Sequence, residues 1–484
     1  MKTSELMASA RVRGTVSGTD RLLHGLVYDS RKAKEGDLFI CLRGLKQDGH
    51  KFAPQAYSQG CRAFLTEEKL PLAEDATQIV VADTRSAMQS LAAAFWGYPA
   101  RKLKLVGITG TNGKTTTSYL VRSILHAAGL KVGLVGTIGN LIADEFIPAQ
   151  HTTPEAPDLQ EMLAQMAERG LTHVVMEVSS HAIAQKRISG GDFTVGVFTN
   201  LTQDHLDYHK TMDAYSRVKA SFFGQLPPDS ASVLNLDDPY HQLMAEASPG
   251  KLIGYSLQAG DVQGEILSLT KEGMLLGIAT PKWHRQVKLA LTGSFNAANS
   301  LAAAGAALAL GVDQAAICRG LSDLKGVPGR FQRVGSGKPT VIVDYAHTPD
   351  GLANVLSTAR KLPIGRLLVV FGCGGDRDRG KRPQMGKIAG ELADFSIVTS
   401  DNPRSEDPLA ICAEVEAGLA ATGGEYIVEP DRKTAIRRAI TMAEPDDLVL
   451  IAGKGHETYQ IFRAETIHFD DVQVAAQCLK EREN

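Results

Sequence analysis

A glycine-rich segment that ends in a lysine and a hydroxyl is the strongest chemical signal in the chain. Residues 107–115 read GITGTNGKT, and they stand between an apolar run typical of a strand and a stretch with helical periodicity. In such a loop, backbone N–H groups hold phosphate oxygens, a lysine neutralises the terminal phosphates and a hydroxyl binds magnesium. Lys114 and Thr115 are placed for the last two roles. The segment therefore predicts nucleotide binding.

This loop departs from the general G-x-x-x-x-G-K-[ST] pattern. Ile108 stands five residues before Gly113, and the other two glycines fall at positions 107 and 110. The alternative is an ordinary strand-to-helix turn with a solvated lysine. We prefer nucleotide binding, because the glycines, the lysine and the hydroxyl occur together.

Three further side chains are candidates for metal or phosphate chemistry. Glu177 stands at the carboxyl end of one apolar run and His205 follows another, so both are placed to reach the edge of the loop. Magnesium prefers oxygen ligands, and a carboxylate with substrate phosphates suits it. A lone histidine is more often a packing residue than a ligand, and a helical lysine such as Lys219 is most often exposed. From the residues alone, only Glu177 is favoured as a ligand.

The elements that position these residues follow a domain-wise pattern. The first hundred residues hold short apolar runs and an alanine-rich helical stretch at 87–95, which favours a small α/β domain. From residues 98–100 onward, strands such as LKLVGITG and THVVMEVS alternate with helical stretches such as SYLVRSILHAAG. This alternation predicts a mostly parallel, helix-covered sheet.

A second change occurs at residues 324–329, where Gly and Pro follow a helical stretch. Beyond it lie four strand patterns, TVIVDYAH, RLLVVFGCGG, FSIVTSDNP and DLVLIAGKG, each with a polar, Gly-rich or Pro-containing end. Open α/β sheets bind ligands outside the carboxyl ends of their strands, so these four ends predict one site. We expect domains at residues 1–98, 99–328 and 329–484.

The composition excludes several classes of protein. The 484 residues are 43% hydrophobic and 22% charged, with 52 basic and 54 acidic side chains and a net charge of -2. This balance predicts no nucleic-acid partner, and no apolar stretch predicts a membrane span. The start, MKTSELMASARVRG, does not resemble a secretory signal, and the six cysteines form no C-x-x-C pair. We expect a cytoplasmic protein with reduced thiols, and a monomer.

The loop variant TGTNGKTT resembles that of the Mur ligases and of the related folylpolyglutamate synthetases, which join a carboxylate to an amine at the expense of ATP. Further segments are similar to the diaminopimelate-adding branch of the Mur ligases: DSR at 29–31, GDLF at 36–39, TTP at 152–154, EVSSH at 177–181, NLTQDH at 200–205, GSFNAAN at 293–299, DYAH at 344–347, DNPR at 401–404 and GKGHE at 453–457. The resemblance implies an α/β fold of three domains: a small N-terminal UDP-binding domain, a central P-loop ATPase-like domain with a mostly parallel sheet, and a Rossmann-like C-terminal domain.

The resemblance also implies which residues contact each ligand. The UDP-muramoyl dipeptide would be held by Ser30, Leu45, Lys46, Gln47, Thr152, Thr153, Ser179, Gln185 and Arg187. The ATP site would comprise Gly110, Thr111, Asn112, Gly113, Lys114, Thr115, Thr116, Asn299, Arg330 and Asp344. Magnesium would be bound by Thr115, Glu177, His205 and Lys219, the lysine as a carbamate. The diaminopimelate site would comprise Arg377, Asp401, Asn402, Pro403, Arg404, Gly453 and Glu457.

The implied reaction is an amide-bond synthesis. ATP phosphorylates the side-chain carboxylate of D-glutamate in the dipeptide, and the amine of meso-diaminopimelate attacks the acyl phosphate. Lys114, Glu177, His205 and Lys219 are the expected catalytic residues. Arg404 bears on specificity, because a guanidinium pairs with the second carboxylate of diaminopimelate, which lysine lacks. A plain Asn-Pro turn with a solvated arginine is the alternative for this segment.

Three rival functions remain open on the sequence. A folylpolyglutamate synthetase-like ligase would share the phosphate loop, but neither this first domain nor the DNPR segment is expected in it. A P-loop kinase or mechanical ATPase of another class would have no amino-acid requirement. A binding module with an inactive nucleotide fold conflicts with the lysine, hydroxyl, carboxylate and arginine set.

Overall fold

The computed structural model describes residues 1–44 and 47–483. The chain divides into two compact units: the first comprises residues 1–114, 125–254 and 305–312, and the second comprises residues 115–124, 255–304 and 313–484. Strands and helices alternate through both, so the predicted α/β class is confirmed. None of the helices in these described ranges is both long and apolar enough to cross a membrane.

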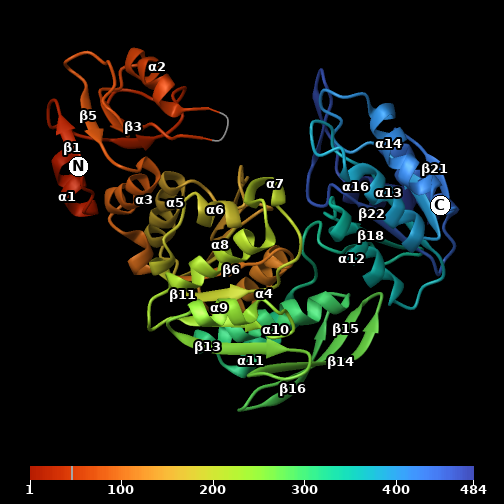
Figure 1. Cartoon of the computed structure of the whole chain (residues 1–484). Coiled ribbons are helices and arrows are strands. Elements are labelled where there is room, and N and C mark those ends of the chain that lie inside the picture. The colour runs from red at the N-terminus through yellow and green to blue at the C-terminus, as the bar shows by residue number, and fades with distance from the viewer. Residues whose placement is uncertain (45–46, 484) are drawn as a thin grey trace. The chain divides into compact units, whose positions relative to one another are not determined.

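The first sheet is built from the short apolar runs at the start of the chain (Figure 1). Its order is β1-β5-β4-β3-β2, and all pairs are parallel except β1 with β5. The Asp83 carboxylate accepts hydrogen bonds from two backbone N–H groups and so caps the third helix. The elements are α1 (Thr3–Ala10), β1 (Thr15–Ser17), β2 (Gly25–Val27), β3 (Asp37–Ile40), η1 (Gly49–Phe52), α2 (Ala53–Ser58), β4 (Ala63–Thr66), β5 (Thr77–Val80) and α3 (Thr84–Phe95).

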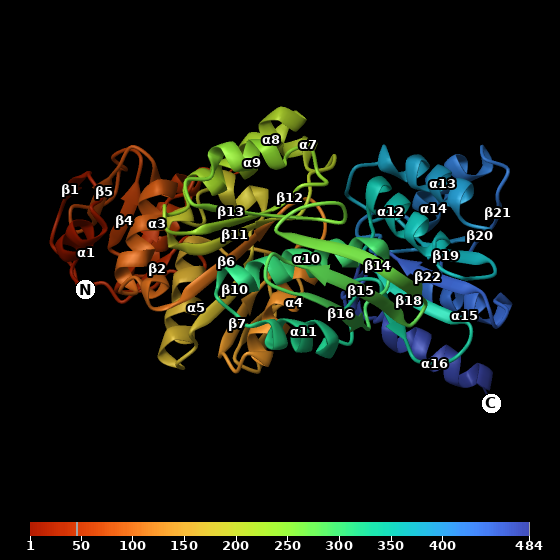
Figure 2. The same cartoon turned by 90° about the horizontal axis from the view of Figure 1, so that it is seen from below.

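The central sheet has the order β16-β15-β14-β13-β12-β11-β6-β10-β7-β8-β9 (Figure 2). Its middle strands β7, β10, β6, β11 and β12 pair in parallel, as predicted. The antiparallel pairs at its ends, β7–β8–β9 and β14–β15–β16, were not predicted. The strands are β6 (Lys104–Thr109), β7 (Val132–Val135), β8 (Asn140–Ile142), β9 (Glu145–Ile147), β10 (His173–Glu177), β11 (Phe193–Phe198), β12 (Ala231–Asn235), β13 (Lys251–Ser256), β14 (Val262–Thr270), β15 (Gly273–Ala279) and β16 (His284–Leu289).

Buried aromatic side chains pack against the middle of this sheet. A Cβ at Gly107 would lie 2.7 Å from the Phe222 ring and 2.8 Å from the Phe193 ring, so a glycine is needed there for the rings to pack on β6. The helices of this part are η2 (Pro99–Lys102), α4 (Lys114–Ala127), α5 (Ala156–Glu168), α6 (Ser180–Ala184), η3 (Gly190–Asp192), α7 (Leu206–His209), α8 (Met212–Gly224), α9 (His241–Ala247), α10 (Ser294–Ala309) and α11 (Gln314–Asp323).

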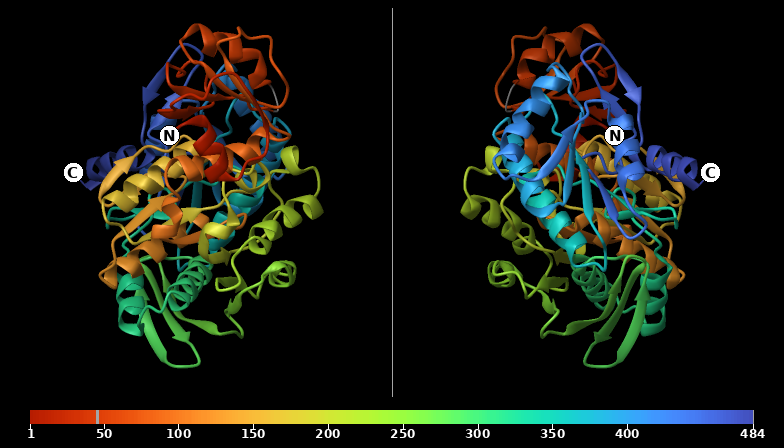
Figure 3. Two further views of the ribbon diagram at one scale, coloured as in Figure 1. Left: turned by 90° about the vertical axis from the view of Figure 1, so that its left-hand side faces the viewer. Right: turned by 90° about the vertical axis from the view of Figure 1, so that its right-hand side faces the viewer.

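The third sheet has the order β17-β18-β22-β19-β20-β21 and is parallel except for β17. Every residue of β19 and β22 is buried, as expected for parallel strands with helices on both faces. The dark-blue helix that ends at C in Figure 3 is α16. The elements are β17 (Gln332–Val334), β18 (Thr340–Asp344), α12 (Pro349–Arg360), β19 (Leu367–Phe371), α13 (Lys381–Leu392), β20 (Phe395–Val398), α14 (Pro408–Ala420), β21 (Glu425–Val428), α15 (Arg432–Met442), β22 (Leu448–Ala452), β23 (Tyr459–Ile461), β24 (Thr466–His468) and α16 (Asp471–Glu483).

Candidate active site

The predicted phosphate loop connects β6 to α4, in the strand–loop–helix order that phosphate binding requires. Gly110 has a φ of 150°, and a Cβ there would lie 1.9 Å from Thr199 Oγ1, so no other residue fits. Lys114 Nζ donates to the carbonyl oxygens of Gly110 (2.9 Å) and Thr111 (2.8 Å). The lysine therefore lies across its own loop, at the N-terminus of α4.

The segment after β11 braces this loop from the side. Thr199 Oγ1 donates to the Asn112 carbonyl (2.6 Å), and Asn200 Oδ1 accepts from the Asn112 N–H (2.9 Å). Thr111 Oγ1 donates to the Thr202 carbonyl (3.2 Å). Part of the NLTQDH segment thus holds the loop in shape, a role that no sequence pattern indicated.

Lys219 is buried, so the interpretation of this residue as an ordinary surface lysine is wrong. Its side chain is on α8, and the residue is only 1% exposed. Nζ donates to the Gly110 carbonyl (3.0 Å) and to Thr109 Oγ1 (3.3 Å). Burial lowers the pKa of Lys219 well below its ordinary value; the charge of Lys114 acts in the same direction and Asp204 opposes it. An amine with a depressed pKa therefore lies beside the phosphate loop.

His205 lies in a cluster of aromatic rings. It has a φ of 54°, in the left-handed region, and 43% of its side chain is exposed. Its ring centre is 4.9 Å from that of His181, and its Nε2 is 3.5 Å from Asp204 Oδ2. The His205 ring therefore packs against His181 and also retains access to solvent.

Tyr215 links the same cluster to the phosphate loop. The His209 ring stacks on Tyr215 with centres 5.1 Å apart, and His209 Nε2 lies 2.9 Å from Ser180 Oγ. The Tyr215 hydroxyl is 3.2 Å from Thr111 Oγ1. Burial raises the pKa of this phenol, so it stays protonated. A tyrosine that was not predicted thus connects α8 to the loop.

Thr137 donates to both oxygens of the Glu177 carboxylate. This carboxylate accepts from the Thr137 N–H (Oε1, 2.9 Å) and from Thr137 Oγ1 (Oε2, 2.9 Å), and Glu177 is 1% exposed. Thr137 Oγ1 is also 3.0 Å from Thr152 Oγ1. These two hydrogen bonds fix the direction of the carboxylate.

The residues predicted to contact the muramoyl dipeptide form one network beside Glu177. Thr153 Oγ1 donates to the Glu177 carbonyl (2.8 Å), and the Ser179 N–H donates to Thr153 Oγ1 (3.1 Å). Arg187 Nη1 donates to the Thr153 carbonyl (2.9 Å), and its Nη2 donates to Gln185 Oε1 (2.7 Å). The structure therefore brings Thr152, Thr153, Ser179, Gln185 and Arg187 together. Glu155, 3.0 Å from Arg187 Nε, joins them without having been predicted.

Ser30 and Gln47, two of the residues predicted to hold UDP, make hydrogen bonds with different partners. Ser30 is 8% exposed, and its hydroxyl donates to Gln55 Oε1 (2.9 Å). The Gln47 carbonyl accepts from the Gly44 N–H (2.9 Å). Leu45 and Lys46 lie outside the described residues. These contacts do not join Ser30 to Gln47.

Within the second unit, two predicted ATP residues contact the first turns of α4. Arg330 Nη2 donates to Thr115 Oγ1 (3.3 Å), and its guanidinium lies 4.6 Å from the centre of the Tyr345 ring. Asn299 Oδ1 accepts from Thr117 Oγ1 (3.4 Å). Thr116, the predicted residue between these two threonines, is buried.

Asp344, the third predicted ATP residue of this unit, is fixed at the end of β18. Its carboxylate accepts from the backbone N–H groups of Phe331 (2.7 Å) and Ala346 (2.8 Å). Burial raises the pKa of this carboxyl group, and Arg330 opposes the rise. These bonds anchor the segment that carries Arg330.

The four polar strand ends of the third sheet lie together, as predicted. β18, β22, β19 and β20 are consecutive parallel neighbours, so their carboxyl ends share one edge. The Gly453 N–H donates to the Asp344 carbonyl (3.1 Å), and Asn402 Nδ2 donates to Glu457 Oε2 (3.0 Å). Residues predicted for the amine substrate therefore meet at this edge.

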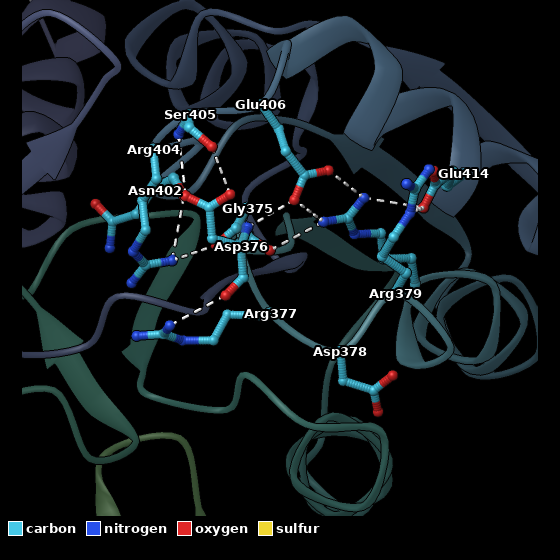
Figure 4. A network of polar contacts seen from close by, with 12 residues as sticks. Gly375, Asp376, Arg377, Asp378, Arg379, Asn402, Arg404, Ser405, Glu406 and Glu414 are labelled. Carbon is cyan, nitrogen blue, oxygen red and sulfur yellow. Dashed lines mark hydrogen bonds and ion pairs between the residues drawn. The ribbon is translucent and has the colours of Figure 1, made fainter. Parts of the chain in front are cut away.

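Arg404 and Arg377 donate to neighbouring carbonyl oxygens (Figure 4). Arg404 Nη1 is 2.8 Å from the Gly375 oxygen, and Arg377 Nη1 is 3.1 Å from the Asp376 oxygen. A Cβ at Gly375 would lie 1.9 Å from the Pro403 oxygen, so only glycine lets these two loops approach. The DNPR segment is thus packed against the loop that carries Arg377.

Side chains that were not predicted hold these two loops together (Figure 4). The Asp376 carboxylate accepts from Ser405 Oγ (2.6 Å) and from the Ser405 N–H (3.2 Å). Glu406 accepts from the Asp376 N–H (2.6 Å) and pairs with the fully buried Arg382 (2.8 Å). The Arg382 pair lowers the pKa of Glu406 to about 2. These contacts therefore hold the loops of Arg377 and Arg404 in fixed positions.

The donor set suits magnesium better than a metal that needs a complete protein cage. Among residues 1–44 and 47–483, no three His, Cys, Asp or Glu side chains gather as a metal site. Magnesium is commonly held by one or two protein oxygens together with substrate phosphates and water. Glu177 supplies an oxygen of that kind in the first unit, and the Thr115 hydroxyl supplies one in the second unit.

Three family models match this chain: the Mur ligase family catalytic domain at residues 22–96, the Mur ligase middle domain at 108–307 and the Mur ligase glutamate ligase domain at 329–455. Two relatives are named UDP-N-acetylmuramoyl-L-alanyl-D-glutamate--2,6-diaminopimelate ligase. The one from Geobacillus kaustophilus is 47% identical, covering 94% of this chain and 95% of its own. The one from Gloeobacter violaceus is 46% identical, covering 100% and 99%.

Solved structures are similar over nearly the whole chain. A structure with the same ligase name has a TM-score of 0.69 and 35% identity, covering 96% of both chains. MurF ligase from Thermotoga maritima, in complex with ADP, has a TM-score of 0.64 at 20% identity, covering 95% of this chain and 99% of its own, which shows a shared fold.

Proposed function

Since the chain belongs to the Mur ligase family, we propose that it is an ATP-dependent ligase that adds meso-diaminopimelate to the D-glutamate side-chain carboxylate of UDP-N-acetylmuramoyl-L-alanyl-D-glutamate. The product is a precursor of peptidoglycan. The observation that carries this proposal is the full-length identity of 46–47% to relatives with that name. A folylpolyglutamate synthetase-like activity is disfavoured, because the relatives match from the first domain onward.

The reaction needs charged groups held in position, and it does not need a protein side chain that bonds covalently to the substrate. A carboxylate oxygen of the substrate attacks the γ-phosphorus of ATP, and ADP leaves. The diaminopimelate amine then attacks the acyl carbon, phosphate leaves, and the nitrogen loses a proton. Lys114 would neutralise the phosphates from the N-terminus of α4, and the loop of Gly110, Thr111, Asn112 and Gly113 would lie against them, held in shape by Asn200. The ADP complex of the Thermotoga relative supports a nucleotide site in this fold.

Magnesium would be held by Glu177, His205 and the Thr115 hydroxyl. When bound, it would neutralise charge on the phosphate oxygens during transfer. The two Thr137 hydrogen bonds support this assignment of Glu177, since they aim the carboxylate before any ligand arrives. The His205 assignment is supported by the exposure of its side chain, because an accessible ring can reach a ligand.

Lys219 would act as a carbamate, formed when its neutral amine adds to carbon dioxide and loses a proton. A buried amine with a depressed pKa favours this step, because the unprotonated nitrogen is the nucleophile. The carbamate would carry a negative charge next to the phosphate loop, and its oxygens would be of the kind that holds a second magnesium ion.

The amine substrate would be selected by Arg404 and Arg377. Each already donates to a backbone carbonyl, which orients the guanidinium and leaves its other N–H groups for a carboxylate. Diaminopimelate supplies that carboxylate at its far end. Lysine does not, so its binding would leave the arginines without an anionic partner.

We also propose the domain bounds 1–98, 99–328 and 329–484, a monomeric state and a cytoplasmic location. The three family matches support the bounds, because each falls inside one segment. The nucleotide-linked substrates support the location, since ATP is made and used in the cytoplasm.

The test is phosphate release from ATP with magnesium and the UDP-muramoyl dipeptide, comparing meso-diaminopimelate with L-lysine. Turnover with diaminopimelate alone is the expected result. Turnover with lysine instead would keep the ligase and overturn the specificity. Release that needs neither amino acid, and that a Lys114→Ala variant abolishes, would indicate a different ATPase.

A further inference from the structure

A fully buried lysine lies at the centre of the predicted diaminopimelate site. Lys454, in the GKGHE segment after β22, has 0% of its surface exposed. Its Nζ donates to Asn402 Oδ1 (3.2 Å), to Glu457 Oε2 (3.2 Å) and to Asp401 Oδ1 (3.5 Å). A single ammonium group therefore contacts three residues that the resemblance assigns to the substrate, although it has no assigned role itself.

Burying an ammonium is costly unless it is paired and hydrogen-bonded. Here the pairing is provided by two carboxylates and an amide oxygen, and the Tyr459 ring lies 5.5 Å away. The backbone before the lysine is also constrained: Gly453 has a φ of 118°, and a Cβ there would lie 3.1 Å from Asp401 Oδ2. The chain thus adopts a conformation that favours glycine just before this lysine.

The lysine determines which atoms of its neighbours remain available. Among the described residues, every hydrogen bond to the Glu457 carboxylate goes to Oε2. Asn402 Oδ1 accepts from Lys454 and from the Ile461 N–H (3.0 Å), and its Nδ2 donates to Glu457. Each group therefore has one orientation, with Glu457 Oε1 left to receive a donor from the substrate.

We propose that Lys454 is a positioning and specificity-determining residue for the amine substrate; this inference rests on the proposed function. Asp401 and Glu457 bring two negative charges, and Lys454, Arg404 and Arg377 bring three positive ones. The far end of diaminopimelate carries one carboxylate and one ammonium, so it can pair with both signs of charge in this site. Lysine presents only an ammonium. Without Lys454 the site loses one positive charge, so it becomes more favourable for lysine relative to diaminopimelate.

Two substitutions separate the charge from the hydrogen bonds. Lys454→Met removes both, whereas Lys454→Gln keeps a donor and removes only the charge. We expect the KM for diaminopimelate to rise at least tenfold in both variants, with the KM for ATP within twofold of the parent. The ratio of kcat/KM for diaminopimelate to kcat/KM for lysine should fall at least tenfold. Both comparisons are made on one preparation, so they do not depend on the fraction that folds.

The matched control is Lys271→Met. Lys271 is another lysine of the second unit, with 16% of its side chain exposed, and it pairs with Asp446 instead. It should keep the parental KM values and selectivity. The inference is overturned if the selectivity ratio of both Lys454 variants equals that of the parent, or if the KM values for all three substrates rise together. A parent enzyme that turns over without diaminopimelate would overturn the proposed function, and this inference with it.

Discussion

Lys219 Nζ lies 4.9 Å from the centre of the Tyr215 ring, on the same helix, α8. The ring has a second partner, since its hydroxyl is 3.2 Å from Thr111 Oγ1 in the phosphate loop. One aromatic side chain thus covers the buried amine and contacts the loop to which that amine donates. Changes at either residue should therefore affect the nucleotide site.

Replacing Lys219 with methionine should stabilise the protein while abolishing its activity. The lysine titrates near 10.5 when unfolded, but its pKa in the folded chain is well below that value because of burial. Between these two values the unfolded state binds the extra proton, so the stability of the parent rises with pH across this window. At pH 7, in buffer free of CO2 and magnesium, Lys219→Met should be about 1 kcal/mol more stable in urea unfolding.

This difference in stability should shrink as the pH is raised toward 10, because the parent then no longer has to release a proton on folding. The matched control is Lys251→Met, since Lys251 is an exposed lysine on β13 in the same unit. The control should change neither the free energy of unfolding nor its pH dependence. A Lys219→Met variant with full activity would contradict the carbamate assignment.

Tyr215 should act on ATP through its hydroxyl and on Lys219 through its ring. Tyr215→Phe keeps the ring and removes the contact with Thr111, so we expect the KM for ATP to rise about fivefold, the worth of one net hydrogen bond. Tyr215→Leu removes both, and kcat should fall as well. Initial rates at varied ATP concentration separate the two effects. Equal losses in the two variants would show that the hydroxyl alone matters.

Replacing Glu177 with glutamine should lower kcat by roughly 100-fold and raise the magnesium concentration needed for half-maximal rate, because an amide is a poorer ligand than a carboxylate. Thr137→Val removes only the hydroxyl that donates to Glu177 Oε2, so kcat should fall by about tenfold. Rates measured across a magnesium titration test both. A magnesium dependence unchanged in Glu177→Gln would exclude this carboxylate as a ligand.

Arg404→Lys should lower kcat/KM for diaminopimelate by at least roughly 100-fold, because a lysine cannot offer two parallel N–H groups to a carboxylate. Arg463→Lys is the matched control: this exposed arginine donates to the carbonyl of Ser405, the residue that follows Arg404. It should keep parental kinetics. Parental kinetics in Arg404→Lys would overturn the specificity assignment.

Much of the candidate site was predictable because its signals are local. The phosphate loop joins a strand to a helix in the order that its glycines and lysine indicated. The four polar strand ends of the third sheet were also expected to meet, since parallel strands end at one edge. The antiparallel strands β14, β15 and β16 were not predicted, because β14 and β16 are largely exposed and lack the continuous apolar runs of the buried parallel strands.

The class of chemistry could be inferred from the sequence without any coordinates: a phosphate loop, a carboxylate at a strand end, and an arginine in a segment suited to a carboxylate. Which side chains are buried, and what they contact, became known only with the folded chain. Lys219 contacts Thr109, which is 110 positions away in the sequence, and Lys454 contacts Asn402, which is 52 positions away. Periodicity reports the local fold of a segment, whereas burial and charge pairing depend on segments that are distant in sequence and adjacent only after folding.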